Sequence, residues 1–197
     1  MAHDHVVVTG GSTGIGAAIC NTLLARGYGV INLSRRPLAS TDQRLVNIAL
    51  DLSDRQATEQ TAKAIADQYN ITGLVHNAGL IRPDLVEDVA LVDYDYLSQV
   101  HIGAAISLTQ AVLPQMKTQQ FGRIVRITSR AALGLQTRTS YSATKAGMMG
   151  MARTWALELG QHGITVNTVA PGPIQDTEMF EAVIPPDSEK INTLAAG

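Results

Sequence analysis

The sequence contains little cysteine, few charged residues and no long apolar run. A single cysteine, Cys20, excludes an internal disulfide, which fits a reducing compartment. Charged residues make up 16% of the chain and the formal net charge is −2, so the basic surface typical of nucleic-acid-binding proteins is absent. No apolar stretch approaches the roughly 20 residues of a membrane span, and residues 1–4 leave no room for a signal peptide before the first apolar strand. We therefore expect a cytoplasmic protein with neither a membrane nor a nucleic acid as its partner.

Metal ligands are also scarce. His3 and His5 form a short His-x-His pair, but no further ligands cluster nearby in the sequence, and a structural metal site needs about four. Cys20 falls inside a predicted helix, where we expect it to fill the core rather than to react. We therefore expect no metal.

Short apolar runs alternate with segments of helical periodicity along the whole chain. The predicted strands are residues 5–8, 29–33, 46–50, 73–76, 122–128 and 165–169, and the predicted helices are residues 14–26, 54–69, 93–117 and 140–160. We expect Asp54 to cap the second helix and Pro114 to interrupt the third near its end. This order predicts a single α/β domain over residues 1–197, built on a doubly wound parallel sheet buried on both faces. Ligands of such a sheet bind beyond the carboxyl ends of its strands.

The glycine-rich segment 9–16, Thr-Gly-Gly-Ser-Thr-Gly-Ile-Gly, joins the first predicted strand to the first predicted helix. Glycines let the backbone approach a pyrophosphate, and a helix N-terminus supplies N–H donors to it. Ile19 stands where the third glycine of a G-x-G-x-x-G pattern would be, so the spacing is T-G-x-x-x-G-x-G. The segment therefore favours dinucleotide binding, with a purely structural glycine turn as the alternative.

Tyr141 and Lys145 stand one helical turn apart, so their side chains share a helix face. A fixed positive charge near a phenol lowers the pKa of the phenol, which then serves as a proton donor and acceptor near neutral pH. Ser129 follows the fifth predicted strand, twelve positions before Tyr141. Together with the glycine-rich segment, these residues indicate an enzyme that transfers hydride.

These motifs, in this order and at this spacing, resemble those of the short-chain dehydrogenase/reductase family over residues 6–177, and in particular its 3-oxoacyl-[acyl-carrier-protein] reductase branch. The resemblance implies a Rossmann-like three-layer αβα fold and NAD(P)-dependent reduction of a carbonyl to a secondary alcohol. It implies that Tyr141 donates the proton and Ser129 holds the developing oxyanion. It also implies that Lys145 lowers the tyrosine pKa and holds the nicotinamide ribose. Thr128 is the less favoured candidate for the hydroxyl that holds the oxyanion. The alternative role of Ser129 is that of a helix cap.

The resemblance also outlines a cofactor site. Asp51, with Leu52 beside it, resembles the family's adenine-binding acid, and segment 77–79 resembles its N-A-G motif. Segment 171–174 is expected along the nicotinamide, and Thr177 is the candidate for a bond to the carboxamide or pyrophosphate. The full set of expected cofactor-binding residues is Gly10, Ser12, Thr13, Gly14, Ile15, Gly16, Ser34, Arg35, Arg36, Asp51, Leu52, Asn77, Ala78, Gly79, Tyr141, Lys145, Pro171, Gly172, Ile174 and Thr177.

The end of the second strand bears on which dinucleotide is bound. An enzyme that uses NAD usually presents an acid to the ribose about 20 residues past the glycines, whereas this chain has Ser34, Arg35 and Arg36 there. A guanidinium fits a 2′-phosphate in bidentate fashion. We therefore predict NADP(H), with Arg35 as the main contact and Ser34 or Arg36 assisting. Two solvated arginines at a strand end are the alternative.

One position departs from the family pattern. Relatives carry an asparagine that anchors a proton-relaying water near the lysine, and this chain has His101 there. An imidazole can donate and accept hydrogen bonds and can gain charge near neutral pH. We therefore expect a relay role and a pH-sensitive rate, with a space-filling buried histidine as the alternative.

The substrate is less closely specified. A 3-oxoacyl thioester or a small ketone fits the motifs, but Gln119, Gln120 and His162 stand where relatives that bind acyl carrier protein place basic residues. This disfavours a carrier-protein substrate. An NAD-dependent alcohol or polyol dehydrogenase and a catalytically impaired NADP-binding regulatory or interaction protein are the alternative functions.

The resemblance carries two expectations about the rest of the chain. Residues 171–197 are expected to belong to a substrate lid, and the sheet is expected to lack the seventh strand with which relatives continue, which would expose a sheet edge. Relatives pair the helices that correspond to residues 93–117 and 140–160 across a two-fold axis. We expect a homodimer or homotetramer built the same way.

Overall fold

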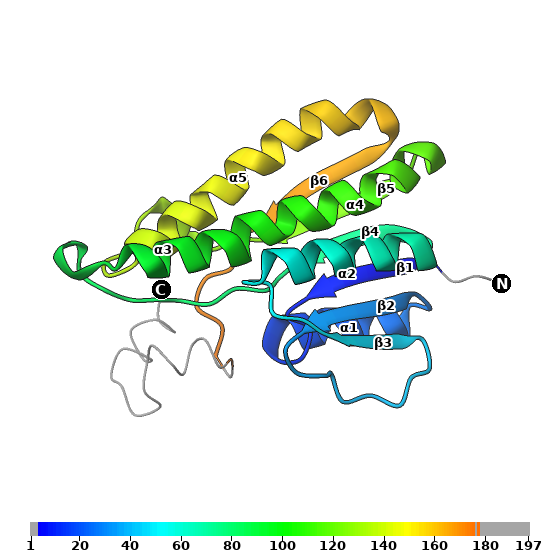
Figure 1. The fold of residues 1–197 in the computed structure, drawn as a ribbon, viewed down its shortest axis with the longest axis horizontal. Helices are drawn as coiled ribbons and strands as arrows, with labels where there is room; N and C mark the ends of the chain where they lie inside the picture. The colour runs from blue at the N-terminus through cyan, green and yellow to red at the C-terminus, as the bar shows by residue number, and fades with distance from the viewer. Residues whose placement is uncertain (1–3, 176, 178–197) are drawn as a thin grey trace.

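The computed structural model describes residues 4–175 and 177, and its core is a six-stranded, all-parallel sheet in the order β3-β2-β1-β4-β5-β6 (Figure 1). The strands are β1 His5–Thr9, β2 Gly29–Ser34, β3 Leu45–Ala49, β4 Ile71–His76, β5 Gly122–Ile127 and β6 Ile164–Val169. The helices are α1 Gly14–Ala25, α2 Arg55–Gln68, α3 Leu91–Ser98, α4 Ala104–Gln119 and α5 Thr139–Leu159, with a π-helical segment η2 Gln99–Gly103 and short 3₁₀ helices η1 Val86–Asp88, η3 Arg130–Leu133 and η4 Gly160–His162. The predicted doubly wound α/β fold is confirmed.

Alternating side chains of β1 pack on opposite faces of the sheet. Val7 joins the larger apolar cluster, which includes buried residues of α2, α4 and α5. Val6 and Val8 join a second cluster with Cys20 and Leu24 of α1. Burial raises the pKa of the Cys20 thiol to about 11, so this cysteine fills the core as expected and is a poor nucleophile.

The expected cap of α2 is confirmed, since the Asp54 carboxylate accepts a hydrogen bond from the backbone N–H of Ala57 at 2.9 Å. The expected helix over 93–117 is different in detail. It begins at Leu91, passes through the π-helical segment η2 and continues past Pro114 to Gln119. Pro114 does not interrupt it.

The physical reason lies in packing. Leu108, Val112 and Met116 of α4 are fully buried on both sides of the proline. Proline removes one backbone donor, and this burial outweighs that single loss. The helix ends instead at Gln120, whose φ of 52° is left-handed.

The strand order reverses between β1 and β4, which is where a parallel sheet forms a crevice for ligands. The glycine turn after β1 and the Asn-Ala-Gly segment after β4 both lie at this point. Residues 171–175 follow β6 without forming a helix or strand, and the rest of the expected lid, apart from Thr177, lies outside the described residues.

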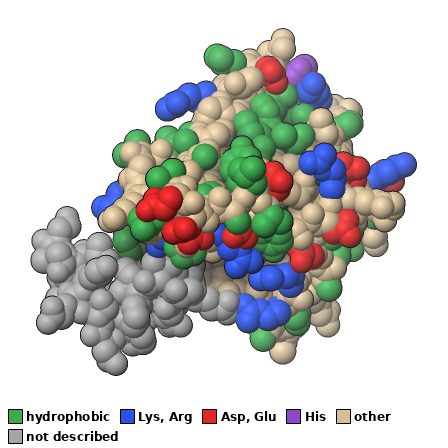
Figure 2. All heavy atoms as spheres, turned by 60° about the vertical axis from the view of Figure 1, so that its left-hand side comes forward, with side chains coloured by type: hydrophobic (Ala, Val, Ile, Leu, Met, Phe, Trp, Pro, Cys, Tyr) green, Lys and Arg blue, Asp and Glu red, His purple; other side chains and the backbone are tan. Residues whose placement is uncertain are grey.

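The surface carries charges of both signs, and on the face shown in Figure 2 the basic and acidic side chains are interspersed. Across residues 4–175 and 177, no helix combines the length and apolarity that a membrane crossing requires.

Candidate active site

The turn between β1 and α1 leaves no room for a side chain at Gly10 or Gly16. Gly10 has a φ of 65°, and a Cβ placed there would lie 2.9 Å from Ala78 Cα. At Gly16 an added Cβ would lie 2.0 Å from the Gly10 carbonyl oxygen. The N-cap residue of α1, Thr13, makes no side-chain hydrogen bond to the first turn of the helix, and the N–H groups of such a turn suit an anionic ligand.

Thr9 and His76 connect this turn to the end of β4. The Thr9 hydroxyl accepts hydrogen bonds from the backbone N–H groups of Asn77 and Ala78 at 3.0 and 2.9 Å, and its own hydrogen points to His76 Nδ1 at 3.1 Å. The Asn77 side-chain amide donates to the Gly10 carbonyl at 3.0 Å. The Asn-Ala-Gly segment is therefore fixed against the glycine turn. Sequence reasoning included Thr9 in the T-G-x-x-x-G-x-G motif without giving it a role, and it missed His76, whose only signal was a polar residue ending a strand.

The far end of the crevice, beyond β2 and β3, is polar. Arg35 and Arg36 are exposed there, while the Ser34 hydroxyl donates to Asn32 Oδ1 at 2.7 Å and is directed into the fold. The Asp51 carboxylate accepts two hydrogen bonds from Ser53, and these, together with the charge of Arg35, lower the pKa of Asp51.

Ser129, Tyr141 and Lys145 lie at the opposite end of the same cleft, whose volume is about 750 Å³. The Ser129 hydroxyl accepts from the Ala131 N–H at 3.1 Å, so the capping role foreseen for it is present. It also forms a hydrogen bond with Tyr141. The Thr128 hydroxyl donates to the Val169 carbonyl at 3.1 Å, which leaves Ser129 as the hydroxyl beside the phenol.

Lys145 is buried next to the tyrosine. Its Nζ donates to the Ile127 carbonyl at 2.9 Å and lies 5.5 Å from the centroid of the Tyr141 ring. Burial, followed by the charge of Arg126, lowers the pKa of Lys145 to about 7. The ammonium is therefore only partly charged at neutral pH.

The expectation that Lys145 lowers the tyrosine pKa is wrong for the structure described here. The pKa of Tyr141 is raised, because burial disfavours the phenolate more than the hydrogen bond from Ser129 and the charge of Arg138 favour it. The same burial lowers the pKa of the lysine, so that it is only partly charged at neutral pH. The phenol is therefore protonated at neutral pH.

His101 is fully buried in η2 and lies edge-on to the Tyr141 ring, with 5.7 Å between ring centroids. Its Nε2 accepts from the Leu80 N–H at 3.3 Å, so Nδ1 carries the hydrogen of the neutral ring and donates to the Thr144 hydroxyl at 2.8 Å. Burial, followed by the charge of Lys145, lowers the pKa of His101 well below its ordinary value. The expectation that it gains charge near neutral pH is therefore wrong.

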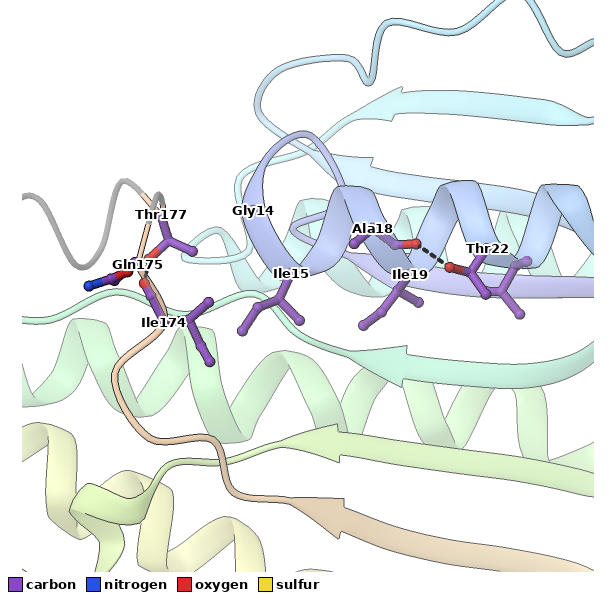
Figure 3. A pocket seen from close by; sticks show the side chains of 9 residues that line it. Gly14, Ile15, Ala18, Ile19, Thr22, Ile174, Gln175 and Thr177 are labelled. Carbon is purple, nitrogen blue, oxygen red and sulfur yellow. Dashed lines mark hydrogen bonds between the residues drawn. The ribbon is translucent and has the colours of Figure 1, made fainter. Parts of the chain in front are cut away.

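The segment after β6 reaches back to the start of α1. Figure 3 shows Ile174 and Thr177 beside Gly14, Ile15 and Ile19, where they enclose a second hollow of about 560 Å³. The Thr177 hydroxyl donates to the Ile174 carbonyl at 2.8 Å, and its methyl carbon would lie 3.4 Å from a Cβ added at Gly14. This places Thr177 against the helix N-terminus.

All the residues expected to bind a dinucleotide line the large cleft, and His101 stands outside its lining. The narrow glycine turn, the uncapped helix N-terminus and the exposed arginines together fit a ligand with a pyrophosphate and a further anionic group. Among the described residues, no group of three or more histidine, cysteine or acidic side chains is placed to hold a metal ion.

Comparison with known families gives one match over most of the chain. The family model described as short chain dehydrogenase matches residues 4–187. This range includes the glycine turn, the Asn-Ala-Gly segment and the residues Ser129, Tyr141 and Lys145.

Individual relatives agree with this match. The chain is 34% identical to the 3-oxoacyl-[acyl-carrier-protein] reductase FabG of Vibrio harveyi, over 96% of this chain and 80% of the relative. It is 33% identical to the (2S)-[(R)-hydroxy(phenyl)methyl]succinyl-CoA dehydrogenase subunit BbsD of Thauera aromatica, over 93% of this chain and 77% of the relative. The crystal structure of a putative NAD(P)-dependent gluconate 5-dehydrogenase from Beutenbergia cavernae with bound NADP superposes with a TM-score of 0.86 at 29% identity, covering 92% of this chain and 76% of that one.

Proposed function

The chain belongs to the short chain dehydrogenase family, and from that premise we propose that this NAD(P)-dependent oxidoreductase uses NADPH to reduce a carbonyl to a secondary alcohol. The observation that carries the proposal is the position of Ser129, Tyr141 and Lys145 at one end of the cleft that begins at the glycine turn. A cofactor bound along the cleft supplies the hydride.

Each of the three side chains has a role in this proposal. Tyr141 is the general acid, and its phenol transfers its proton to the carbonyl oxygen. Ser129 donates a hydrogen bond to the same oxygen as negative charge develops there. Lys145, held by the Ile127 carbonyl, would orient the nicotinamide ribose, and in its protonated form it would stabilise the phenolate that remains after the proton has left.

The state of Tyr141 supports reduction over oxidation. Burial raises the pKa of the phenol, so its proton is present at neutral pH. A proton donor is what carbonyl reduction requires, whereas alcohol oxidation requires the phenolate as base. The protonated phenol therefore suits carbonyl reduction at neutral pH.

His101 is a positioning residue in this proposal. It is neutral, and both its ring nitrogens are bonded within the chain. It holds Leu80 and Thr144, and Thr144 in turn donates to the Tyr141 carbonyl at 3.0 Å. We propose that the imidazole fixes the backbone beside Tyr141 rather than relaying protons.

The cofactor preference rests on charge at the end of β2. Arg35 and Arg36 both line the cleft there, and the nearest acid in the lining, Asp51, belongs to the end of β3. A 2′-phosphate is therefore met by guanidinium groups rather than by a carboxylate. The bound NADP of the gluconate dehydrogenase relative supports the same choice.

The role of Tyr141 is tested by Tyr141→Phe, which removes the acidic proton and keeps the ring. We expect turnover of NADPH with a panel of small ketones and 3-oxoacyl thioesters to fall at least about 100-fold, because a positioned general acid contributes at least that much. NADPH binding, followed by calorimetry or by quenching of Trp155, is expected to stay within about threefold. Tyr94→Phe on α3, where the tyrosine is exposed and outside the cleft lining, is the matched control.

Near-normal turnover by Tyr141→Phe would contradict the assigned role. If the wild-type chain binds NADPH tightly but reduces nothing in the panel, the enzyme proposal fails and a regulatory NADP-binding protein takes its place. The panel includes thioesters because the relatives named above act on such compounds by their names.

A further inference from the structure

The end of the cleft that holds Tyr141 is lined by three arginines: Arg82, Arg130 and Arg138. Asp51 is the only carboxylate among the described residues that line the cleft, and it follows β3, at the opposite end. The space beside the phenol is therefore positively charged, although the protein as a whole has a net charge of −2. Such a field attracts anions.

Arg138 is the arginine closest to the chemistry along the chain. It precedes α5 as its N-cap residue, three positions before Tyr141, and both residues line the cleft. The two groups also interact electrostatically: the charge of Arg138 lowers the pKa of Tyr141 and the phenol raises that of Arg138.

Arg138 is a buried residue, and no carboxylate of the described part of the chain pairs with its guanidinium. The residue is only 6% exposed, and its Nη1 donates to the carbonyl and hydroxyl oxygens of Thr137. No acidic side chain in residues 4–175 or 177 forms an ion pair with it. A buried cation that lacks a counter-charge is costly, and an anion from outside would offset that cost.

The other two arginines differ from Arg138. Arg82 is paired with Asp93 at 3.4 Å and lies over the Tyr96 ring, so its charge is partly offset. Arg130 is exposed, and its guanidinium carbon would lie 4.0 Å from a Cβ added at Gly172. Arg138 alone of the three is buried and has no counter-charge from residues 4–175 or 177.

Two apolar side chains complete this end of the cleft. Leu133 and Leu135 line it and are 86% and 60% exposed. Exposed leucines that flank a cleft favour a ligand with an apolar part. The combination of Arg138 with these leucines points to a substrate that has an anionic group near its carbonyl and a short hydrocarbon body.

We propose that the substrate of this reductase is an oxo acid whose carboxylate binds the guanidinium of Arg138 while its ketone faces Ser129 and Tyr141. This inference rests on the proposed function, since it names the substrate class of the same site. The reaction remains a ketone reduction: hydride from the reduced dinucleotide forms the new C–H bond, and the Tyr141 proton forms the O–H bond. The carboxylate is bound and does not react.

The test compares each acid with its neutral ester. A series of 2-, 3- and 4-oxo acids of five and six carbons is assayed with NADPH beside the corresponding methyl esters. We expect kcat/KM for at least one acid to exceed that of its ester at least about 100-fold, because a site built around a hydrogen-bonded charge strongly rejects an analogue without it. Binding of the matching hydroxy acid, measured by calorimetry with the oxidised cofactor present, is expected to follow the same order.

Arg138→Gln is expected to lower kcat/KM for the acids much more than for the esters, so that the acid-to-ester ratio falls to within about tenfold of unity. Arg138→Lys keeps the charge and is expected to retain a preference for acids, which guards against a variant that simply fails to fold. Arg26→Gln, which removes the same charge from the exposed end of α1 outside the cleft, is the control and is expected to leave the ratio unchanged.

Two results would overturn the inference. Esters reduced as well as acids by the wild type would show that no anion is recognised. An equal loss of activity towards acids and esters in Arg138→Gln would show that Arg138 serves only the phenol. If neither acids nor esters are reduced at all, while NADPH still binds, it is the proposed function that fails.

Discussion

Arg35 is the residue on which the choice of cofactor depends most. It is exposed at the end of β2 and lines the cleft, and its charge also lowers the pKa of Asp51 across the crevice. We expect Arg35→Asp to raise the KM for NADPH by about ten- to hundredfold, since a charge-assisted hydrogen bond contributes about 1.5–3 kcal/mol. The KM for NADH is expected to change less than about threefold.

Steady-state kinetics with both cofactors measure this effect, with Arg26→Asp as a control for the change in net charge. An unaltered ratio of the two KM values would rule out the guanidinium as the reader of the 2′-phosphate. A fall in affinity for both cofactors alike would point to a structural role at the end of β2.

That the candidate residues share one cleft was predictable, because they follow strands in a fixed order, and every residue expected to bind the dinucleotide lines that cleft. Their protonation was not predictable. The spacing of Tyr141 and Lys145 suggested a charged lysine beside an acidic phenol, but burial raises the tyrosine pKa and lowers that of the lysine to about 7. Burial depends on residues brought together from β4, β5, η2 and α5, and local spacing does not encode it.

At the level of helices, the outer face of α5 is open to a partner. Gly150 has nothing within 4 Å of the position of an added Cβ, and Leu157, two turns further on, is 86% exposed. Small residues allow helices to approach closely, and a homodimer uses the same surface twice. We propose that α5, together with α4, forms the interface between two copies of the chain.

Leu157→Glu is expected to shift the protein to a smaller species, because two copies of the new carboxylate would be buried near each other at a two-fold interface. Sedimentation velocity across a range of concentrations measures this shift. Tyr28→Glu, on the turn between α1 and β2, is the control. A wild-type chain that sediments as a monomer at all concentrations would contradict the proposal.

The predicted helix boundaries lie within about two residues of the observed ones. The one error in helix type lies inside the predicted helix 93–117, part of which is π-helical and not α-helical. No sequence pattern predicted the π-helical turn at Gln99–Gly103. That turn brings the Val100 carbonyl within 3.1 Å of His76 Nε2 and places His101 in contact with Thr144. A π-helical turn contains one residue more than an α-helical turn. Because the contacts that hold this turn come from β4 and α5, tertiary packing stabilises it rather than local propensity.

The molecule as a whole carries a group of buried basic side chains: His76, His101, Arg126 and Lys145. Arg126 is fully buried on the Trp155 ring, 4.5 Å from its centroid, and burial lowers its pKa to about 10. Burial, followed by the charges of Arg126 and Lys145, lowers the pKa of His76 to about 3. Folding therefore keeps both histidines neutral at a pH where the unfolded chain would protonate them.

The sign of the effect on stability follows from this difference. Between pH 3 and the ordinary histidine pKa near 6.5, the unfolded state binds more protons than the folded state, so stability falls as the pH falls through this range. Each such histidine contributes a slope of up to about 1.4 kcal/mol per pH unit. Lys145 acts in the same direction between pH 7 and its ordinary value of 10.5, so its contribution increases stability as the pH rises.

His76→Gln is expected to lower stability at pH 7, because its bonds to Thr9 and Val100 are weakened. It is also expected to reduce the slope of unfolding free energy against pH between 4 and 6 by about 1.4 kcal/mol per pH unit. Urea unfolding at several pH values measures both effects, and His162→Gln in η4 is the matched control. A slope equal to that of the wild type would mean that His76 is already protonated in the folded chain.

The bonds that hold the glycine turn in shape also have a consequence for the order of events in time. Gly16 fits against the Gly10 carbonyl and the Asn77 amide. In the sheet, β1 pairs with two strands: its His5 is aligned with Gly29 of β2, which is close in the sequence, and with Ile71 of β4, which is much further along the chain. Contacts between distant segments form late, since a longer loop must close first. During synthesis, every glycine of the turn therefore leaves the ribosome together with β1, α1 and β2. The turn reaches its final shape only later, after β4 has left the ribosome and paired with β1.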